Sequence, residues 1–267
     1  MKTRTRVPPP IALTIAGSDS GGGAGIQADL KTFQRFGVFG TSVVTAITAQ
    51  NTVGVSAWEA VNADLVRAQI DAVAKDLRPG AVKSGMLANT TIVETVARSL
   101  REHAFAPYVL DPVMVATSGD PLLTPETVGA IRTQLIPLAA LITPNLDETE
   151  LLVGAKVRDA NAMKSAAEEL VTKHGARAAL VKGGHLTGDT MHDVLFADGV
   201  AHVFTRPRID TTSTHGTGCT LSSAITALLA DGEPLLRAVQ QALDYVHEAI
   251  LTAPGLGAGH GPLNHGA

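Results

Sequence analysis

The chain has 267 residues, of which 45% are hydrophobic and 17% are charged, so it can build a substantial core and is not globally disordered. A net charge of −4 and a set of six Phe, two Tyr and one Trp argue against a nucleic-acid binder, which needs a basic stripe or a platform for base stacking. The single cysteine excludes an internal disulfide and fits a cytoplasmic protein, and the longest apolar runs have only about half the length of a membrane span.

The chain opens with a basic, proline-rich stretch. Residues 1–10 contain three positive side chains and three prolines, and we expect them to form a disordered tail. A basic arm for an acidic partner is the weaker alternative, because three charges are few. Residues 11–267 show no shift in composition and no repeat of fixed period, so this part is expected to form a single domain.

Short apolar runs typical of strands alternate with amphipathic stretches typical of helices. Strands are expected at residues 11–16, 42–48, 108–110, 141–143 and 179–182, and helices at residues 64–77, 91–103, 125–135 and 161–174. This alternation predicts an α/β fold in which parallel strands are joined by helical crossovers and the sheet is covered on both faces. Two late runs, residues 194–196 and 201–204, predict an antiparallel hairpin.

Polar residues follow most of these apolar runs directly. They are the glycine loop 17–25, Gln50, Asp111, the pair Asn145 and Glu148, and Lys182. In open α/β sheets, ligands collect beyond the carboxyl ends of the strands. We therefore expect these residues to meet at one edge of the sheet, as they would in an enzyme.

The glycine loop at residues 17–25 matches neither common nucleotide fingerprint. The chain has no Gly-Lys pair for a Walker loop, and Gly21 and Gly23 are followed by Ile26 instead of the third glycine of a dinucleotide loop. This argues against a dehydrogenase. Asp29 lies one turn into the following helix, where the simple interpretation is a carboxylate that favours the helix N-terminus.

Several of the polar residues allow both a functional and a structural interpretation. The Gln50 amide presents a donor beside an acceptor, which matches a heterocycle with an amino group next to a ring nitrogen, but it could instead satisfy loop backbone. Asn145 and Glu148 suit a helix cap or, with Asp111, a water-rich Mg²⁺ site. Lys182 suits a nucleotide phosphate or is a surface lysine.

Residues 214–223 place a glycine turn directly before a helix. Gly216 and Gly218 let several N–H groups converge where the positive helix end points, which attracts phosphate or a developing oxyanion. Cys219 begins the helix, where the dipole favours a thiolate. The alternative is a plain turn with cysteine as filler. A hydrolase built on Cys219 and His215 is disfavoured because the turn between them is not helical.

Seven segments in the same order carry a family resemblance. They are Ala16-Gly-Ser-Asp-Ser-Gly-Gly-Gly-Ala-Gly-Ile-Gln-Ala-Asp-Leu-Lys, Thr45-Ala-Ile-Thr-Ala-Gln-Asn-Thr, Lys83-Ser-Gly-Met-Leu, Leu110-Asp-Pro-Val-Met-Val, Thr143-Pro-Asn-Leu-Asp-Glu, Val181-Lys-Gly-Gly-His-Leu and Thr214-His-Gly-Thr-Gly-Cys-Thr-Leu. With them the chain resembles the ribokinase-like superfamily and, within it, the hydroxymethylpyrimidine/phosphomethylpyrimidine kinases of thiamin synthesis. The resemblance implies a doubly wound, mostly parallel sheet with a small late hairpin.

The resemblance also implies two transfers from ATP, assisted by Mg²⁺, in a protein that forms homodimers. The first phosphorylates 4-amino-5-hydroxymethyl-2-methylpyrimidine, and the second converts the monophosphate to the diphosphate. The implied residues fall into four groups: Gly17, Asp29, Gln50, Met86 and Val113 for the pyrimidine; Lys182, Asn145 and Thr214 for ATP; Asp111 and Glu148 for the metal; and Gly216, Thr217, Gly218 and Cys219 for catalysis.

Cys219 stands where most ribokinase-like enzymes carry an aspartate base. We expect the exchange to serve the second transfer, because a thiol can be neutral beside an anionic monophosphate and thiolate for the alcohol. Pyridoxal kinase activity on the same fold is the nearest alternative. A ligand sensor that has lost turnover is disfavoured, because Asp111, Glu148, Lys182 and Cys219 are all present.

Overall fold

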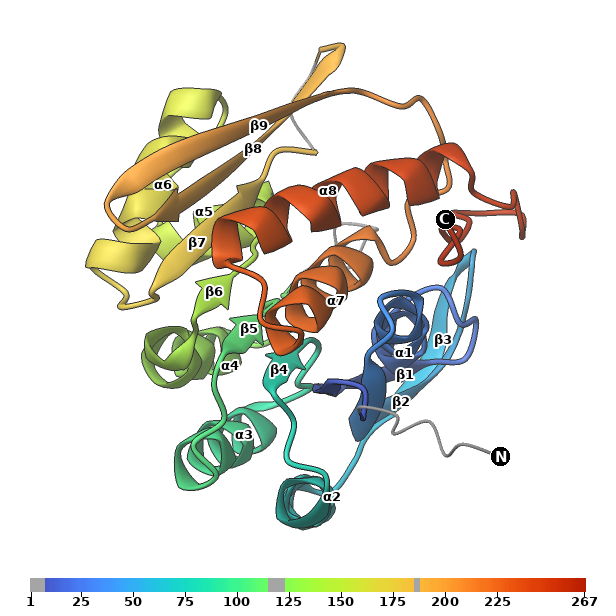
Figure 1. The fold of residues 1–267 in the computed structure, drawn as a ribbon, viewed down its shortest axis with the longest axis vertical. Helices are drawn as coiled ribbons and strands as arrows, with labels where there is room; N and C mark the ends of the chain where they lie inside the picture. Colours follow the sequence, from blue (N-terminus) through green and yellow to red (C-terminus); the bar gives the residue numbers. More distant parts are fainter. Residues whose placement is uncertain (1–7, 115–122, 185–187) are drawn as a thin grey trace, which may run out of the picture.

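The computed structural model describes residues 8–114, 123–184 and 188–267, which build a nine-stranded sheet in the order β3-β2-β1-β4-β5-β6-β7-β8-β9 (Figure 1). The strands are β1 (Ile11–Asp19), β2 (Phe39–Asn51), β3 (Gly54–Ala60), β4 (Ala81–Ser84), β5 (Tyr108–Leu110), β6 (Leu141–Ile142), β7 (Ala178–Lys182), β8 (Thr190–Ala197) and β9 (Val200–Pro207). Six adjacent strands run parallel, in the sheet order β2, β1, β4, β5, β6 and β7. Strand β3 pairs antiparallel at one edge, and β8 and β9 do so at the other.

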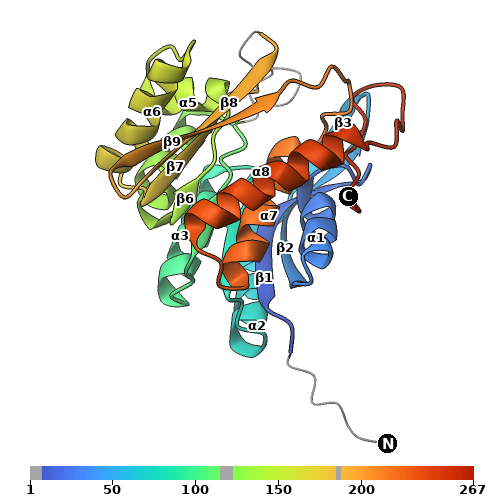
Figure 2. The same cartoon turned by 45° about the horizontal axis from the view of Figure 1, so that its top comes forward.

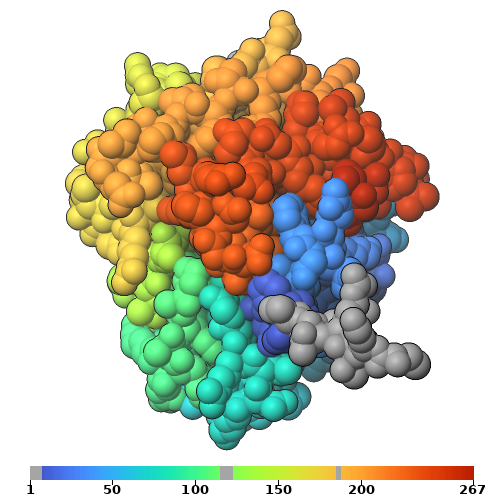
Figure 3. All heavy atoms as spheres, in the orientation of Figure 1, coloured from blue at the N-terminus to red at the C-terminus, as the bar shows by residue number. Residues whose placement is uncertain are grey.

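Helices cover both faces of the sheet, as expected. One face carries α1 (Gly25–Arg35), α7 (Thr217–Ala230) and α8 (Leu235–Leu251), which form the blue and orange-red surface in Figure 3. The other carries α2 (Ala63–Asp76), α3 (Thr90–Glu102), α4 (Pro125–Ala130), α5 (Leu146–Val153) and α6 (Ala160–Thr172) (Figures 1 and 2). A π-helical turn (Ile131–Leu135) and a 3-10 turn (Ile136–Leu138) continue α4. Of the helices in the described part of the chain, none is both long and apolar enough to cross a membrane.

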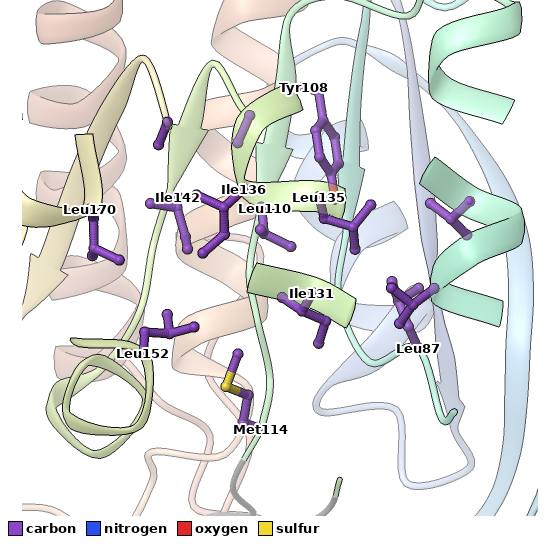
Figure 4. Close-up of a cluster of buried hydrophobic side chains, with 14 of the residues drawn as sticks. Leu87, Tyr108, Leu110, Met114, Ile131, Leu135, Ile136, Ile142, Leu152 and Leu170 are labelled. Atoms are coloured by element: carbon purple, nitrogen blue, oxygen red, sulfur yellow. The ribbon is translucent and has the colours of Figure 1, made fainter. Parts of the chain in front are cut away.

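The central strands are buried on both faces, which explains their continuous apolar sequences. In β5, Tyr108 and Leu110 pack with Ile131, Leu135 and neighbouring side chains on one face (Figure 4). Val109 faces the opposite way, toward the core under α7 and α8. Full burial of one such apolar side chain contributes roughly 1.5–3 kcal/mol, so the sheet gives the site a rigid base.

The structure confirms the predicted strands and helices, with longer strands at several ends. The late hairpin is β8–β9, whose two-residue turn has positive φ at Asp198 (51°) and Gly199 (76°), as Asp-Gly hairpin turns prefer. The predicted helix at residues 125–135 is α4 with its π-helical turn. The sequence-based prediction omitted β3, β4 and α8, and residues 1–7 of the predicted tail lie outside the described residues.

The sheet order places a topological switch at β1. Strand β1 pairs with β2 on one side and with β4 on the other, and the chain crosses on opposite faces to reach them. Ligands bind at such a point, beyond the carboxyl ends of the strands. The ends of β1, β2, β5, β6 and β7 carry the polar residues that the sequence singled out.

Candidate active site

The turn before α7 exposes backbone donors at the carboxyl edge of the sheet. Gly216 caps the helix with φ 83°, and a Cβ there would lie 1.9 Å from the carbonyl oxygen of Gly23, so only glycine fits. Thr217 donates to the Thr214 carbonyl oxygen through its N–H (3.3 Å) and its Oγ1 (2.7 Å). Within the described residues, the N–H groups of Gly218 and Cys219 have no acceptor. Two free amides at a helix start make an anion site.

A partly buried lysine and a buried carboxylate lie beside these amides. Lys182 Nζ is 3.3 Å from Asp111 Oδ1, and Ser222 Oγ donates to Asp111 Oδ2 over 3.1 Å. A Cβ on Gly218 would lie 3.2 Å from Lys182 Nζ, so the lysine and the turn border the same space. Burial lowers the pKa of Lys182, but the carboxylates of Asp111 and Glu148 raise it further, so its ammonium stays charged.

Asn145 and Glu148 form a capping box at the start of α5. Asn145 Oδ1 accepts the Glu148 N–H (2.8 Å), and Glu148 Oε2 accepts the Asn145 N–H (2.8 Å). Glu148 Oε1 accepts the Met114 N–H (3.2 Å). The capping interpretation is therefore confirmed. The capping box also orients the Glu148 carboxylate, which a bound metal ion would need.

The same carboxylates fit a water-rich Mg²⁺ site. Burial raises the pKa of Glu148, the Lys182 ammonium lowers it, and the charge of Asp111 raises it again; a cation bound beside the two carboxylates would favour their ionised forms. In the part of the chain that the structure describes, no three His, Cys, Asp or Glu side chains cluster as metal ligands. Mg²⁺ usually takes one or two carboxylates and completes its shell with phosphates and water, which Asp111 and Glu148 can satisfy.

Asp29 corrects one sequence-based interpretation, because its carboxylate does not serve the start of α1. The first turn of α1 contains no acidic residue, and Asp29 is fully buried. Its Oδ1 accepts from Lys83 Nζ (2.8 Å) and Ser223 Oγ (2.6 Å), and its Oδ2 accepts from Thr14 Oγ1 (2.6 Å). The predicted direct contact of Asp29 with the pyrimidine would need one of these donors to move.

The Cys219 thiol is half-buried between two carboxylates. Burial raises its pKa, Asp29 and Asp111 raise it further, and Lys83 and the Gly25 N–H lower it, with a net value of about 12. The expectation that the helix dipole favours a thiolate is therefore wrong for the ligand-free protein. The dipole acts, but loss of solvent and two nearby negative charges outweigh it.

Four of the five expected pyrimidine residues lie at or near the carboxyl ends of β1, β2, β4 and β5, whereas Asp29 lies in α1. A Cβ on Gly17 would lie 3.5 Å from Met86 Sδ, so these two residues are neighbours. Val113 has φ 39°, which for a β-branched residue costs on the order of 1–3 kcal/mol and is typical of functional sites. Gln50 is half-buried at the end of β2, and its side-chain amide contacts Thr48 and His215 rather than loop backbone.

Sequence reasoning missed Asp19 and His215 as a pair. Asp19 Oδ2 lies 2.8 Å from His215 Nε2 and also accepts the N–H groups of Gly23 (3.1 Å) and Ala24 (2.8 Å). An aspartate in a glycine-rich turn after a strand was the available signal. Lys83 was also missed, although a charged residue inside a short apolar run is unusual. His260 and His265 contact Thr214 and Thr220 and not one another.

The segment after α8 closes over the turn at residues 214–216. The His215 N–H donates to the Gly261 carbonyl oxygen (3.1 Å), and His215 also pairs with Pro262 as an isolated bridge. Gly257 and Gly259 approach Thr52 so closely that a Cβ would lie 2.2 and 2.1 Å from its atoms. This glycine-rich segment therefore joins the end of β2 to the anion site.

Comparisons with known proteins agree with this geometry. Residues 19–264 match the family described as Phosphomethylpyrimidine kinase. A hydroxymethylpyrimidine/phosphomethylpyrimidine kinase of Bacillus subtilis is 49% identical over 255 residues, covering 95% of this chain and 94% of the relative. The crystal structure of a phosphomethylpyrimidine kinase of Clostridium difficile shares 44% identity and a TM-score of 0.81, covering 90% of this chain and 99% of that one.

A second solved structure is the ADP complex of a Bacillus subtilis pyridoxal kinase. It has a TM-score of 0.91 at 38% identity and covers 97% of this chain and 98% of that one. The fold is therefore the doubly wound kinase fold that the resemblance implied. The chain belongs to the phosphomethylpyrimidine kinase family.

Proposed function

We propose that this protein transfers the γ-phosphoryl group of ATP to 4-amino-5-hydroxymethyl-2-methylpyrimidine and then to the resulting monophosphate, for thiamin biosynthesis. The observation that supports this proposal most directly is the pair of free N–H groups at Gly218 and Cys219, next to the charged side chains of Lys182 and Asp111. Membership in the family supports the substrate class.

The residues divide the work of phosphoryl transfer. The Gly218 and Cys219 amides meet the charge on the transferred group, and Lys182 holds the phosphates as a point charge. Thr214 and Asn145 position the nucleotide. Asp111 and Glu148 would hold Mg²⁺ largely through water, and the ion when bound neutralises phosphate charge.

Cys219 faces the acceptor in both transfers. A monophosphate is already ionised near neutral pH, with a second pKa of about 6, so a neutral thiol suits it. A carboxylate about 4 Å away would repel it by roughly 4 kcal/mol per charge. For the alcohol the thiol has to ionise, which the charge of Lys83 favours.

Pyridoxal phosphorylation is the second candidate activity. The ADP-bound pyridoxal kinase has a TM-score of 0.91 to this chain, and both substrates are small heterocycles with a hydroxymethyl group. Identity is higher to the pyrimidine kinases, and the Gln50 amide matches an aminopyrimidine edge. We therefore propose the pyrimidine, rather than pyridoxal, as the main substrate.

The chain is also proposed to act as a homodimer in the cytoplasm. Four apolar side chains on and beside the β2–β3 hairpin are about half exposed or more: Ile47, Val53, Val55 and Trp58. Exposed apolar side chains along an edge hairpin favour contact with a second chain. The single unpaired cysteine suits a reducing compartment.

The decisive experiment measures ADP release with the alcohol, its monophosphate and pyridoxal. The wild type should turn over both pyrimidines faster than pyridoxal. Cys219→Ala should slow the alcohol reaction on the order of 10²-fold, the size of a lost general base, and the monophosphate reaction much less. Cys219→Asp should keep the alcohol reaction and lose the monophosphate one. Equal losses on both pyrimidines would contradict the proposed role of the thiol.

A further inference from the structure

Asp19 holds both sides of the contact between the glycine loop after β1 and the turn before α7. Its Oδ2 accepts the N–H groups of Gly23 (3.1 Å) and Ala24 (2.8 Å), and its Oδ1 accepts the N–H of Gly21 (2.8 Å). The same Oδ2 lies 2.8 Å from Nε2 of His215, which belongs to the turn. One buried carboxylate therefore joins segments that are 196 positions apart in the chain.

The Asp19 carboxyl is ionised at neutral pH, so it acts only as an acceptor. Burial raises its pKa, but hydrogen bonds from His215 and from the loop N–H groups outweigh burial and bring the pKa below its ordinary value. The proton in the contact with His215 is therefore carried by Nε2 of the ring. A hydrogen bond to an ionised group is roughly twice as strong as one between neutral groups, so this contact ties the two segments firmly.

The two segments also interlock through their backbones. Gly216, the N-cap of α7, approaches the carbonyl oxygen of Gly23 so closely that a Cβ would lie 1.9 Å from it. At Gly23 itself, a Cβ would lie 2.6 Å from Cδ2 of His215. Asp19 thus fixes both the Gly23 backbone and the His215 ring, at the point where the turn rests on the loop.

This point lies directly before the two free amides of the anion site. Gly218 and Cys219 follow Gly216 by two and three residues. The Thr220 N–H donates to the Gly216 carbonyl oxygen over 2.8 Å, which joins Gly216 to the first turn of α7. A shift of Gly216 against the loop therefore moves both amides relative to Lys182.

We infer that Asp19 and His215 are positioning residues for phosphoryl transfer, because their contact sets where the two free amides at the start of α7 lie against the transferred group. The inference rests on the proposed kinase function and deepens it. Both side chains act through the turn and not on the reacting atoms. A misplacement of about 1 Å costs as much as 10²-fold in rate, so a loosened turn should lower kcat.

The neighbouring Gln50 offers a second route by which His215 could act. Its Nε2 lies 3.4 Å from the same ring nitrogen of His215. If His215 acted through Gln50, its removal would raise the KM of the pyrimidine and leave kcat unchanged. If it acts through the turn, kcat falls for both acceptors while the KM of the pyrimidine stays the same.

The test measures kcat and KM with the alcohol and with its monophosphate, for the wild type, His215→Leu and His215→Gln. Leucine has no proton for Asp19, so His215→Leu should lower kcat roughly 10–10²-fold on both acceptors at an unchanged pyrimidine KM. A glutamine amide can donate to Asp19 again, so His215→Gln should recover most of this loss. His103→Leu is the matched control, because His103 at the end of α3 contacts Asp71 of α2 over 2.6 Å, before β5 and away from the carboxyl edge. It should keep the wild-type kcat.

Dissociation constants of ADP with Mg²⁺, with and without aluminium fluoride, give a readout that is independent of turnover. Aluminium fluoride takes the place of the transferred group. His215→Leu should therefore weaken the complex with aluminium fluoride by about the same factor as kcat and leave the Kd of ADP alone unchanged. Thermal melting checks folding. If His215→Leu does not fold, Gly23→Ala presses on the same ring and should separate the two dissociation constants in the same way.

A folded His215→Leu protein with the wild-type kcat would overturn the inference, and so would a raised pyrimidine KM without loss of kcat. Equal weakening of ADP with and without aluminium fluoride, or a His215→Gln variant as impaired as His215→Leu, would also overturn it. Failure of the wild type to phosphorylate either pyrimidine would instead contradict the proposed function. The comparison with aluminium fluoride would still test the positioning role, because it needs no acceptor.

Discussion

At the scale of single residues, two ion pairs lie near the Cys219 thiol, one fully buried and one partly buried. Lys83 pairs with Asp29 over 2.8 Å, and Lys182 pairs with Asp111 over 3.3 Å. Removing one partner of the fully buried Lys83–Asp29 pair should cost about 3–5 kcal/mol, so this pair holds the site together as well as charging it. Burial is the main cause of the raised pKa of Cys219, and the carboxylates of Asp29 and Asp111 raise it further.

The Cys219 thiol should therefore react with iodoacetamide more slowly at pH 7 than an ordinary cysteine. Because its pKa is raised to about 12, the thiolate fraction keeps rising with pH. The alkylation rate of folded protein should increase about tenfold per pH unit through pH 10, whereas an unperturbed thiol levels off near its pKa of about 8.5. Mass spectrometry gives the rate, and urea-unfolded protein is the control. A plateau below pH 9 in folded protein would contradict the raised pKa.

At the scale of elements, the start of α7 is the part of the site that tolerates substitution least. It needs positive φ at Gly216 and open space at Gly218, where Lys182 and Asp111 approach. The glycine loop after β1 packs directly on this turn. The Gly25 N–H at the start of α1 contacts the Cys219 thiol at the start of α7, so the two helix starts lie side by side.

Gly218→Val should lower kcat by roughly 10²–10³, because its branched side chain enters the space beside Lys182 and blocks the free amides. Gly218→Ala should be milder, since its Cβ comes close only to the flexible end of Lys182 (3.2 Å) and meets Asp111 Oδ2 at an ordinary contact distance (3.6 Å). Gly129→Val is the matched control, because a Cβ at Gly129 meets no atom within 4 Å. Kinetics and thermal melting separate activity from folding. A folded Gly218→Val protein with normal kcat would rule out the anion site.

The sequence could predict the central elements of the fold and the edge where the site lies. Continuous apolar runs are typical of strands in a sheet that is buried on both faces. The residues that follow such strands lie at the carboxyl edge of the sheet. It could not predict β3, which is exposed along most of its length and lacks the apolar alternation of a half-buried strand. The pairs Lys83–Asp29 and Asp19–His215 join residues 54 and 196 positions apart, which no local pattern reveals.

At the scale of the whole molecule, the β2–β3 hairpin extends the sheet beyond its helical cover. Trp58 in β3 is 50% exposed, and Ile47 in β2 is 60% exposed. Unpaired edge strands with apolar side chains pair readily with another chain. Within one protomer, Thr52 at the tip of the hairpin contacts the segment after α8. The proposed dimer surface therefore lies close to the pyrimidine side of the site.

Sedimentation should therefore give a dimer for the wild type and a larger monomer fraction for Trp58→Glu. A charge in an apolar contact loses its hydration without a partner, which weakens association. Leu236→Glu is the control, because Leu236 is 44% exposed on α8, on a different part of the surface. A wild type that stays monomeric at high concentration, or a Trp58→Glu variant as dimeric as the wild type, would contradict this surface.

The contacts of residues 257–262 with Thr52 and His215 have a consequence for the order of refolding. Contacts between positions so far apart in sequence form slowly. We therefore expect diluted, denaturant-unfolded protein to regain its secondary structure before it regains ATP turnover.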